Sequence, residues 1–251
     1  MPKPTVTKVL AELRAHSSAE HRASKARLGI PLDSALGVSL PVIRQMGRAL
    51  GRDQKLAEAL WESGYHEARL LAVLVAGPEA MTVKLAERWL AEVTSWDLCD
   101  HLCNNLLIKL PFAPSRIPAW AADEREFVRR AAFALMCSLS IHHTEIEQPL
   151  VEQHLGLIRR YARDPRHYVK KAVSWALREI GKKDRDYGVL DQALALAHEL
   201  AASGNAAERW VGKDALKELE TLTAAPGRRR LVSSTTKSGA RAARPKPTRS
   251  R

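Results

Sequence analysis

The sequence is poor in cysteine and has no long apolar run. No stretch of its 251 residues approaches the roughly 20 uninterrupted apolar residues that a transmembrane helix needs, so we expect no membrane association. The first residues, MPKPTVTKVLAEL, lack the apolar core and the small-residue cleavage site of a secretion signal, which predicts a cytoplasmic protein. The three cysteines, Cys99, Cys103 and Cys137, are too few and odd in number for a disulfide framework and fit a reducing compartment.

The common nucleotide-binding and hydrolase motifs are also missing. The sequence contains no GxxxxGK[ST], no GxGxxG after a strand, no HExxH and no GxSxG. Cys99 and Cys103 stand four residues apart and could share a metal on one helix face, but no second Cys or His pair with zinc-finger spacing follows. His142 and His143 lack a third ligand. We therefore expect no metal and no small-molecule cofactor, and we expect both cysteines to be small core residues.

Positive charge is concentrated near the C-terminal end. The net charge is +12, yet residues 226–251 hold nine of the 40 Lys and Arg and none of the 28 Asp and Glu. Residues 1–225 therefore carry 31 basic and 28 acidic side chains. The basic segment has almost no large apolar side chains to offset its ordering entropy, so it predicts a disordered tail behind a single domain over residues 1–225. Such an arm suits a phosphate backbone, and the alternative is a solubilising tail.

Helical periodicity runs through the rest of the chain. Apolar residues recur three and four apart, as in Leu56, Leu60, Leu70, Leu71 and Leu74, and we find no credible strand. Helix-length segments recur with a period of about 40 residues, which is the range of HEAT and armadillo repeats. We predict an all-α fold of HEAT-like helical repeats, stacked as a curved α-solenoid with a concave face. The alternative is a compact irregular bundle.

Basic residues recur as adjacent pairs in successive helical segments. The pairs are Arg129–Arg130, Arg159–Arg160, Lys170–Lys171 and Lys182–Lys183. In a stacked array, one member of each pair can reach the same concave face, which predicts a basic groove that follows phosphates. The alternative is that each pair solvates an exposed helix face.

One tryptophan shares a helix face with a carboxylate. Trp96 and Asp100 are four residues apart, so a helix places both side chains on one side. An indole offers a flat apolar surface, and a carboxylate can stabilise positive charge or orient water. The alternative is a half-buried tryptophan beside a solvated aspartate. Asp97 lies off this face, and we expect it to complement the helix dipole in the first turn.

A second tryptophan lies among basic residues. Lys171 precedes Trp175 by four positions and Arg178 follows it by three, so all three share a face. This interleaving of an aromatic side chain with cations is typical of nucleic-acid surfaces. The alternative is a tryptophan packed between helices while its basic neighbours extend to solvent.

Four segments carry a resemblance to a known family. They are WESGYHEARLLAVLV (61–75), SWDLCDHLC (95–103), FVRRAAFALM (127–136) and YVKKAVSWALREIGK (168–182). In this order they resemble the DNA alkylation repair family of HEAT-like-repeat glycosylases, the AlkD-like proteins. The SWD and KKAxxWALRE segments are the most specific parts of the resemblance, which spans residues 35–220.

The resemblance implies an activity and a site. Family members remove positively charged N3- and N7-alkylated purines from duplex DNA by hydrolysing the N-glycosidic bond, without flipping the base into a pocket and without a metal or cofactor. The matching positions assign catalysis to Asp100, Trp96 and Trp175, and they assign a groove arginine to Arg130. Neighbouring basic residues complete the expected DNA-binding set: Arg129, Lys170, Lys171, Arg178 and Lys182.

The implied chemistry agrees with these residue types. A cationic alkylpurine is already a good leaving group, so the need is to stabilise the positive sugar that forms, which a carboxylate and two indoles can do. Arginine and lysine hold the phosphates. We therefore expect a monomeric, nucleoid-associated DNA repair glycosylase. Two alternatives stay open, a non-catalytic DNA- or RNA-binding repeat protein and a protein-interaction scaffold.

Overall fold

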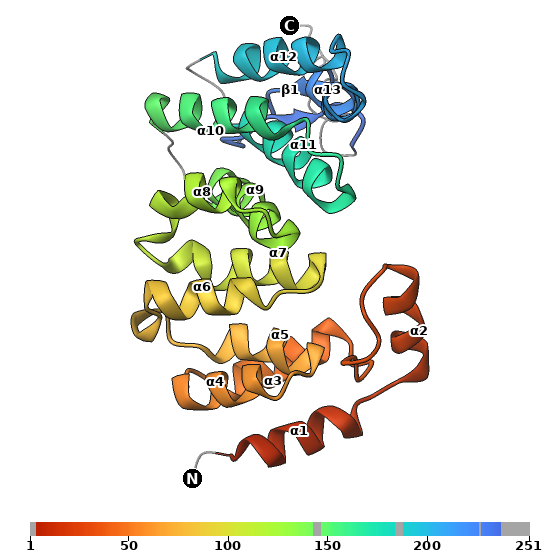
Figure 1. Ribbon diagram of the computed structural model, residues 1–251, viewed down its shortest axis with the longest axis vertical. Coiled ribbons are helices and arrows are strands. Elements are labelled where there is room, and N and C mark those ends of the chain that lie inside the picture. Colours follow the sequence, from red (N-terminus) through yellow and green to blue (C-terminus); the bar gives the residue numbers. More distant parts are fainter. Residues whose placement is uncertain (1–3, 143–146, 184–187, 226, 237–251) are drawn as a thin grey trace, which may run out of the picture. The chain divides into compact units, whose positions relative to one another are not determined.

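The structure is a computed structural model and describes residues 4–142, 147–183, 188–225 and 227–236. Internal contacts divide the chain into two compact units, Met1–Ala131 and Ala132–Arg251. Nearly all regular structure in the described ranges is α-helical, which confirms the predicted all-α class (Figure 1). The single domain expected over residues 1–225 stays a prediction. Within the described ranges, no helix is long and apolar enough to cross a membrane.

The first unit is built from short helices. They are α1 (Val6–Ala15), α2 (Ala19–Arg27), α3 (Leu40–Leu50), α4 (Gln54–Glu62), α5 (His66–Val75), α6 (Val83–Ala91), α7 (Trp96–Asn105), α8 (Ala113–Ala122) and the start of α9 (Glu126–His142), with 3₁₀ turns at Pro78–Ala80 and Leu107–Lys109. Asp53 caps α4, since its carboxylate accepts from the backbone N–H of Leu56 at 3.1 Å. Ser95 precedes α7, but its hydroxyl donates to Asp97 instead of capping the helix.

Equivalent positions in the first unit recur at short intervals. His66 on α5 bonds Asp97 on α7, 31 positions later, and Asp100 on α7 bonds Arg130 on α9, 30 positions later. The ion pair between α6 and α8 repeats the pattern with a separation of 29. The predicted period of about 40 is therefore wrong for this unit. Helices α4 to α8 have only 9 or 10 residues each, which shortens every repeat.

The second unit has longer helices and a longer period. Its helices are α10 (Gln148–Tyr161), α11 (His167–Gly181), α12 (Val189–Ala201) and α13 (Ala206–Leu219). Ser174 on α11 bonds Asp214 on α13, and Arg159 on α10 bonds Glu199 on α12, both across 40 positions. The predicted period is confirmed here. Constant offsets of this kind mean that α12 stacks on α10 and α13 on α11 in register.

Two tryptophans form the centre of the first unit's core. Trp61 and Trp89 stack with ring centroids 4.3 Å apart and planes 2° from parallel, and both are almost fully buried. The Trp61 indole N–H donates to Glu92 at 2.8 Å, and the Arg69 guanidinium lies 5.2 Å from the Trp61 ring centroid. These contacts join α4, α5 and α6 into one packed block.

The cysteines are buried core residues, as expected. Cys99, Cys103 and Cys137 are all free thiols. The Cys99 thiol donates to the carbonyl of Phe127 at 3.4 Å, and the Cys103 thiol donates to that of Ala131 at 3.6 Å. Both bonds link α7 to α9. No group of metal-ligating side chains occurs among the residues that the structure describes, and His143 lies outside them.

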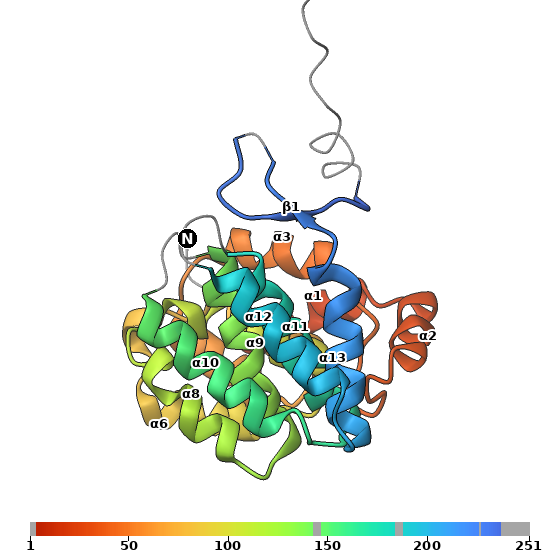
Figure 2. The ribbon, with the colours of Figure 1, turned by 90° about the horizontal axis from the view of Figure 1, so that it is seen from above.

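A short β-hairpin follows α13. Strands β1 (Leu222–Thr223) and β2 (Val232–Ser233) pair antiparallel, and Figure 2 shows them continuing beyond the end of α13. Arg230 forms an ion pair with Glu179 on α11, and the backbone N–H of Leu231 donates to the Lys182 carbonyl at 2.9 Å. The prediction of no strand is therefore wrong at Leu222–Thr223 and Val232–Ser233. The disordered tail from residue 226 stays a prediction, and residues 237–251 lie outside the described residues.

Candidate active site

Helix α7 presents Trp96 and Asp100 together, as their spacing predicts. Both side chains are half-buried on the same face of the helix. The Trp96 indole N–H donates to the carbonyl of Leu28, just after α2, at 3.0 Å. This bond fixes the orientation of the indole through its N–H. The apolar ring remains the part of the side chain that can contact a ligand.

Asp100 is held by a buried arginine. Arg130 on α9 donates from Nε to one carboxylate oxygen at 3.0 Å and from Nη2 to the other at 2.8 Å. The arginine side chain is 7% exposed and that of Asp100 is 18% exposed. Burial raises the pKa of the Asp100 carboxyl, and the positive charge of Arg130 opposes that effect. The arginine that the sequence assigns to DNA thus orients the carboxylate, and its phosphate contact stays a prediction.

A second carboxylate stands at the start of the same helix. Asp97 accepts from His66 Nε2 at 2.9 Å and from the Ser95 hydroxyl at 2.7 Å. Burial raises the pKa of Asp97, but the hydrogen bonds from His66 and Ser95, together with the charges of His66 and Lys25, outweigh burial and leave it lowered. Asp97 does lie in the first turn, as expected, but its pairing with His66 of the previous repeat has no signal in the sequence.

A buried histidine follows Asp100. His101 Nε2 lies 3.1 Å from the Leu70 carbonyl, and Nδ1 lies 3.2 Å from the side-chain nitrogen of Asn105. Nε2 therefore carries the proton and Nδ1 accepts. Burial lowers the pKa of His101 to about 4, so the ring is neutral at neutral pH. The charges close to Asp100 are then those of Arg130 and Asp97.

The remaining predicted residues on α11 belong to the second unit. Trp175 is half-buried, and Lys171 is exposed. Arg178 and Lys182 both bond Glu218 on α13, at 2.8 and 2.7 Å. Two of the predicted DNA-binding side chains are therefore engaged within the repeat stack. Any phosphate contact would have to compete with that carboxylate.

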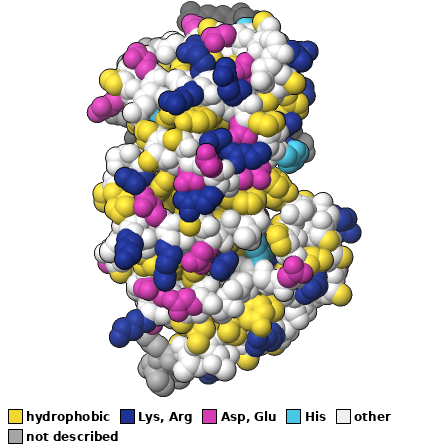
Figure 3. Space-filling view, in the orientation of Figure 1, with side chains coloured by type: hydrophobic (Ala, Val, Ile, Leu, Met, Phe, Trp, Pro, Cys, Tyr) yellow, Lys and Arg dark blue, Asp and Glu magenta, His cyan; other side chains and the backbone are white. Residues whose placement is uncertain are grey.

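The predicted basic pairs have different partners within the repeat stack. Arg159 on α10 pairs with Glu199 on α12, whereas the Lys170–Lys171 pair lies on α11, which stacks on α13. In the first unit, Arg129 Nε donates to the Ala121 carbonyl at the end of α8. That one member of every pair reaches a common surface stays a prediction. Figure 3 shows Lys and Arg side chains mixed with Asp and Glu on the face in view, in keeping with these ion pairs.

The residues predicted to be catalytic are divided between the units. Trp96 and Asp100 lie in the first unit with Arg130, and Trp175 lies in the second. The structure joins Asp100 and Arg130 by a direct ion pair, and Trp96 shares the α7 face of Asp100. Convergence of Trp175 on them stays a prediction.

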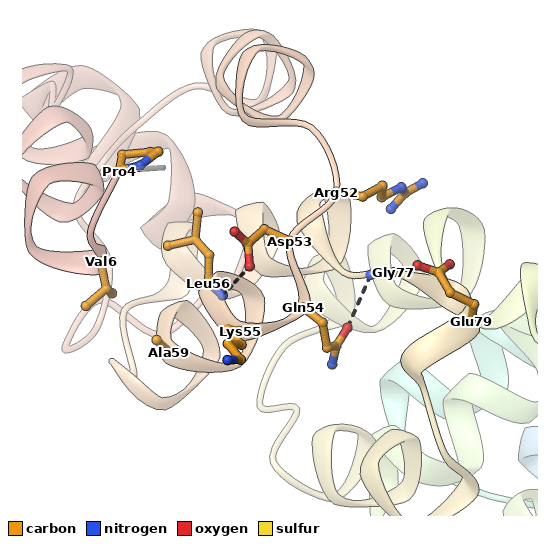
Figure 4. Close-up of a pocket in the computed structure, with 10 residues that line it drawn as sticks. All are labelled: Pro4, Val6, Arg52, Asp53, Gln54, Lys55, Leu56, Ala59, Gly77 and Glu79. Atoms are coloured by element: carbon orange, nitrogen blue, oxygen red, sulfur yellow. Dashed lines mark hydrogen bonds between the residues drawn. The ribbon is translucent and has the colours of Figure 1, made fainter. Parts of the chain in front are cut away.

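A separate cavity opens at the start of α4 in the first unit. It has a volume of 620 Å³, and its lining residues are Pro4, Val6, Arg52, Asp53, Gln54, Lys55, Leu56, Ala59, Gly77 and Glu79 (Figure 4). Arg52 is tied to the carbonyls of Leu74 and Ala76. No predicted site residue lines this cavity, so it does not bear on the chemistry above.

Comparison with known proteins identifies the family of this chain. A family model described as DNA alkylation repair enzyme matches residues 9–219. No curated protein sequence matches the chain. A solved structure, described as a new family of proteins related to the HEAT-like repeat DNA glycosylases with affinity for branched DNA structures, is 19% identical with a TM-score of 0.70, covering 84% of this chain and 94% of that one. That likeness confirms the HEAT-like fold. A designed armadillo repeat protein in complex with a peptide is 16% identical with a TM-score of 0.36, covering 70% and 90%.

Proposed function

Because the chain belongs to the DNA alkylation repair enzyme family, we propose that it is a DNA glycosylase that excises positively charged N3- and N7-alkylated purines from duplex DNA. One observation carries this proposal. Trp96 and Asp100 share a face of α7, and Arg130 holds the Asp100 carboxylate through both oxygens. A fixed carboxylate beside an indole suits a reaction in which a sugar becomes positively charged.

Asp100 would stabilise the transition state. The alkylated base carries its own positive charge and leaves without a strong general acid. The bond to C1′ breaks, the electron pair departs with the base, and the sugar becomes oxocarbenium-like. Each Asp100 oxygen keeps one lone pair after its bond to Arg130, so the carboxylate can accept from the attacking water while its charge faces the sugar.

The other residues would position DNA. The Trp96 ring would pack on the deoxyribose and favour its developing charge, and Trp175 would do so from the second unit. Lys171 and the remaining basic side chains of α9 and α11 would contact phosphates, which fix the register of the duplex without reading its sequence. This mechanism needs no metal or cofactor and one copy of the chain.

The test is release of 7-methylguanine or 3-methyladenine from methylated duplex DNA by the purified protein. Asp100→Asn should lower the single-turnover excision rate by about 10²-fold or more, the effect of removing one electrostatic stabiliser, and should leave DNA affinity nearly unchanged. Asp123→Asn is the matched control, because Asp123 also pairs with an arginine, Arg125, on the surface of the same unit. Equal loss of binding and excision in Asp100→Asn would make Asp100 a structural residue.

A second candidate is non-catalytic binding to structured DNA. It is favoured by the occupation of both Asp100 oxygens by Arg130 and by the affinity for branched DNA ascribed to the relative of the same fold. No base release together with tighter binding to a three-way junction than to a duplex of equal length would select this function.

A further inference from the structure

The stacking of α13 on α11 forms a regular ladder that begins with a tryptophan. Ser174 bonds Asp214 and Arg178 bonds Glu218, each across 40 positions. One turn earlier, Lys170 Nζ lies 5.0 Å from the centroid of the Trp210 ring, again across 40 positions. Trp210 is thus fixed at one end of the ladder by a cation over its ring.

Trp210 is not part of the core of its unit. Helix α13 packs through the stripe Val211, Ala215 and Leu219, which is almost fully buried. At Gly212, α13 approaches the backbone of α12 so closely that a Cβ would not fit. Trp210 lies beside this stripe and is half-buried, in contrast to the fully buried tryptophan stack of the first unit. Part of the indole is therefore available at the surface.

Lysines surround that indole. Lys213 and Lys217 follow Trp210 by three and seven positions, so they lie on the same side of α13, and both are exposed. Lys170 approaches from α11. Asp214 and Glu218 follow Trp210 along the ladder, and both are paired with residues of the stack. Asp214 accepts from Ser174 at 2.8 Å and lies 3.8 Å from Lys217 Nζ, and Glu218 pairs with Arg178 at 2.8 Å. The surface around the indole is therefore cationic.

We propose that Trp210, with Lys170 and Lys213, forms a binding subsite for an unpaired nucleotide of DNA. The exposed part of the indole would stack on a base that has left its partner, a contact that tolerates any sequence because every base has a flat face. The lysines would hold the flanking phosphates. A paired base is already stacked on its neighbours, so a continuous duplex would gain only the phosphate contacts. This subsite needs no excision and does not rest on the proposed glycosylase activity.

The experiment compares the affinity of the full chain for a labelled single strand and for the blunt duplex of the same sequence, by fluorescence anisotropy at fixed salt. Trp210→Leu should weaken single-strand binding about tenfold, because it removes one base–aromatic stack, and should change duplex binding less than about twofold. Trp210→Phe keeps an aromatic face and should retain most of the affinity. Lys213→Glu should weaken both ligands more than Lys84→Glu, a charge-matched change at an exposed position on α6.

A second readout does not depend on the leucine variant folding. Single-stranded DNA should quench the tryptophan fluorescence of the wild-type protein, and Trp210→Phe should lose a resolvable share of that quenching while still binding. Unchanged quenching in Trp210→Phe would overturn the proposal, as would an equal effect of Trp210→Leu on single strand and duplex. Base release from methylated duplex should persist in both variants, so failure of this subsite and failure of the glycosylase proposal are separable.

Discussion

Removal of the Arg130 charge tests how the candidate site holds its carboxylate. In Arg130→Met, Asp100 keeps its charge at 18% exposure and loses both bonds to the guanidinium. Breaking a buried ion pair by removing one partner costs about 3–5 kcal/mol, because an uncompensated charge remains. Asp100 retains some contact with solvent, so we expect the lower end, about 3 kcal/mol, which corresponds to a fall of roughly 6–12 °C in melting temperature for a chain of this size.

The assay is thermal unfolding of the wild type, Arg130→Met, Asp100→Leu and the double variant. The double variant should recover most of the stability, because no buried charge is left unpaired. In Arg130→Met, burial alone raises the pKa of Asp100 above its unfolded value. A carboxyl with a raised native pKa stabilises the fold below its unfolded pKa, about 3.9, and that contribution is lost as pH rises. The deficit of Arg130→Met should therefore be larger at pH 7 than at pH 4.

Arg125→Met is the control for this experiment. Arg125 also pairs with an aspartate, Asp123, but its side chain is 58% exposed, so its loss should cost less than about 1 kcal/mol. If Arg130→Met costs no more than this control, and if the double variant is simply the sum of its parts, Asp100 is solvated. Arg130 would then not be the residue that orients Asp100.

Three further predictions concern other parts of the chain. His154 is fully buried, and neither ring nitrogen has a hydrogen-bond partner among the residues that the structure describes. Burial lowers its pKa to about 4, so stability present above the unfolded pKa near 6.5 is lost as pH falls. Urea unfolding should show that His154→Leu removes about 2 kcal/mol of the loss between pH 7 and pH 5. Deleting residues 237–251, which hold six Lys and Arg, should weaken binding to damaged and undamaged duplex alike and flatten its salt dependence in anisotropy titrations, and unchanged binding would assign the segment another role. Arg230→Ala should accelerate hydrogen exchange at the Leu231 amide by releasing the hairpin from Glu179, and equal protection in both proteins would contradict that anchoring.

The sequence by itself determined the features that depend on local spacing. Apolar residues three and four apart specify helices wherever they occur, so the all-α class followed directly. Trp96 and Asp100 share a face because four residues make slightly more than one turn of any α-helix, whatever that helix packs against. The Asp53 cap is equally local, since its carboxylate needs only the N–H groups of the turn that follows.

Sequence spacing could not determine which side chains meet between repeats. Arg130 reaches Asp100, and Arg178 reaches Glu218, because stacked helices come into register at offsets set by helix length and loop length. Those lengths differ between the units, so the offset is 30 for the first pair and 40 for the second. From the sequence alone, such a basic residue is therefore predicted to bind phosphate. Only the structure shows that it has an acidic partner.

The C-terminal segment also combines a feature that its composition determines with contacts that only the fold determines. The composition of this segment, with almost no large apolar side chains, indicates that it has little apolar surface to bury. Residues 227–236 nonetheless make specific contacts, because Arg230 forms an ion pair with Glu179 and β2 pairs with β1. The proposed role of Trp210 likewise depends on Lys170, which α11 brings over the indole ring. Each of these contacts joins residues far apart in the chain, and only packing in three dimensions brings their surfaces together.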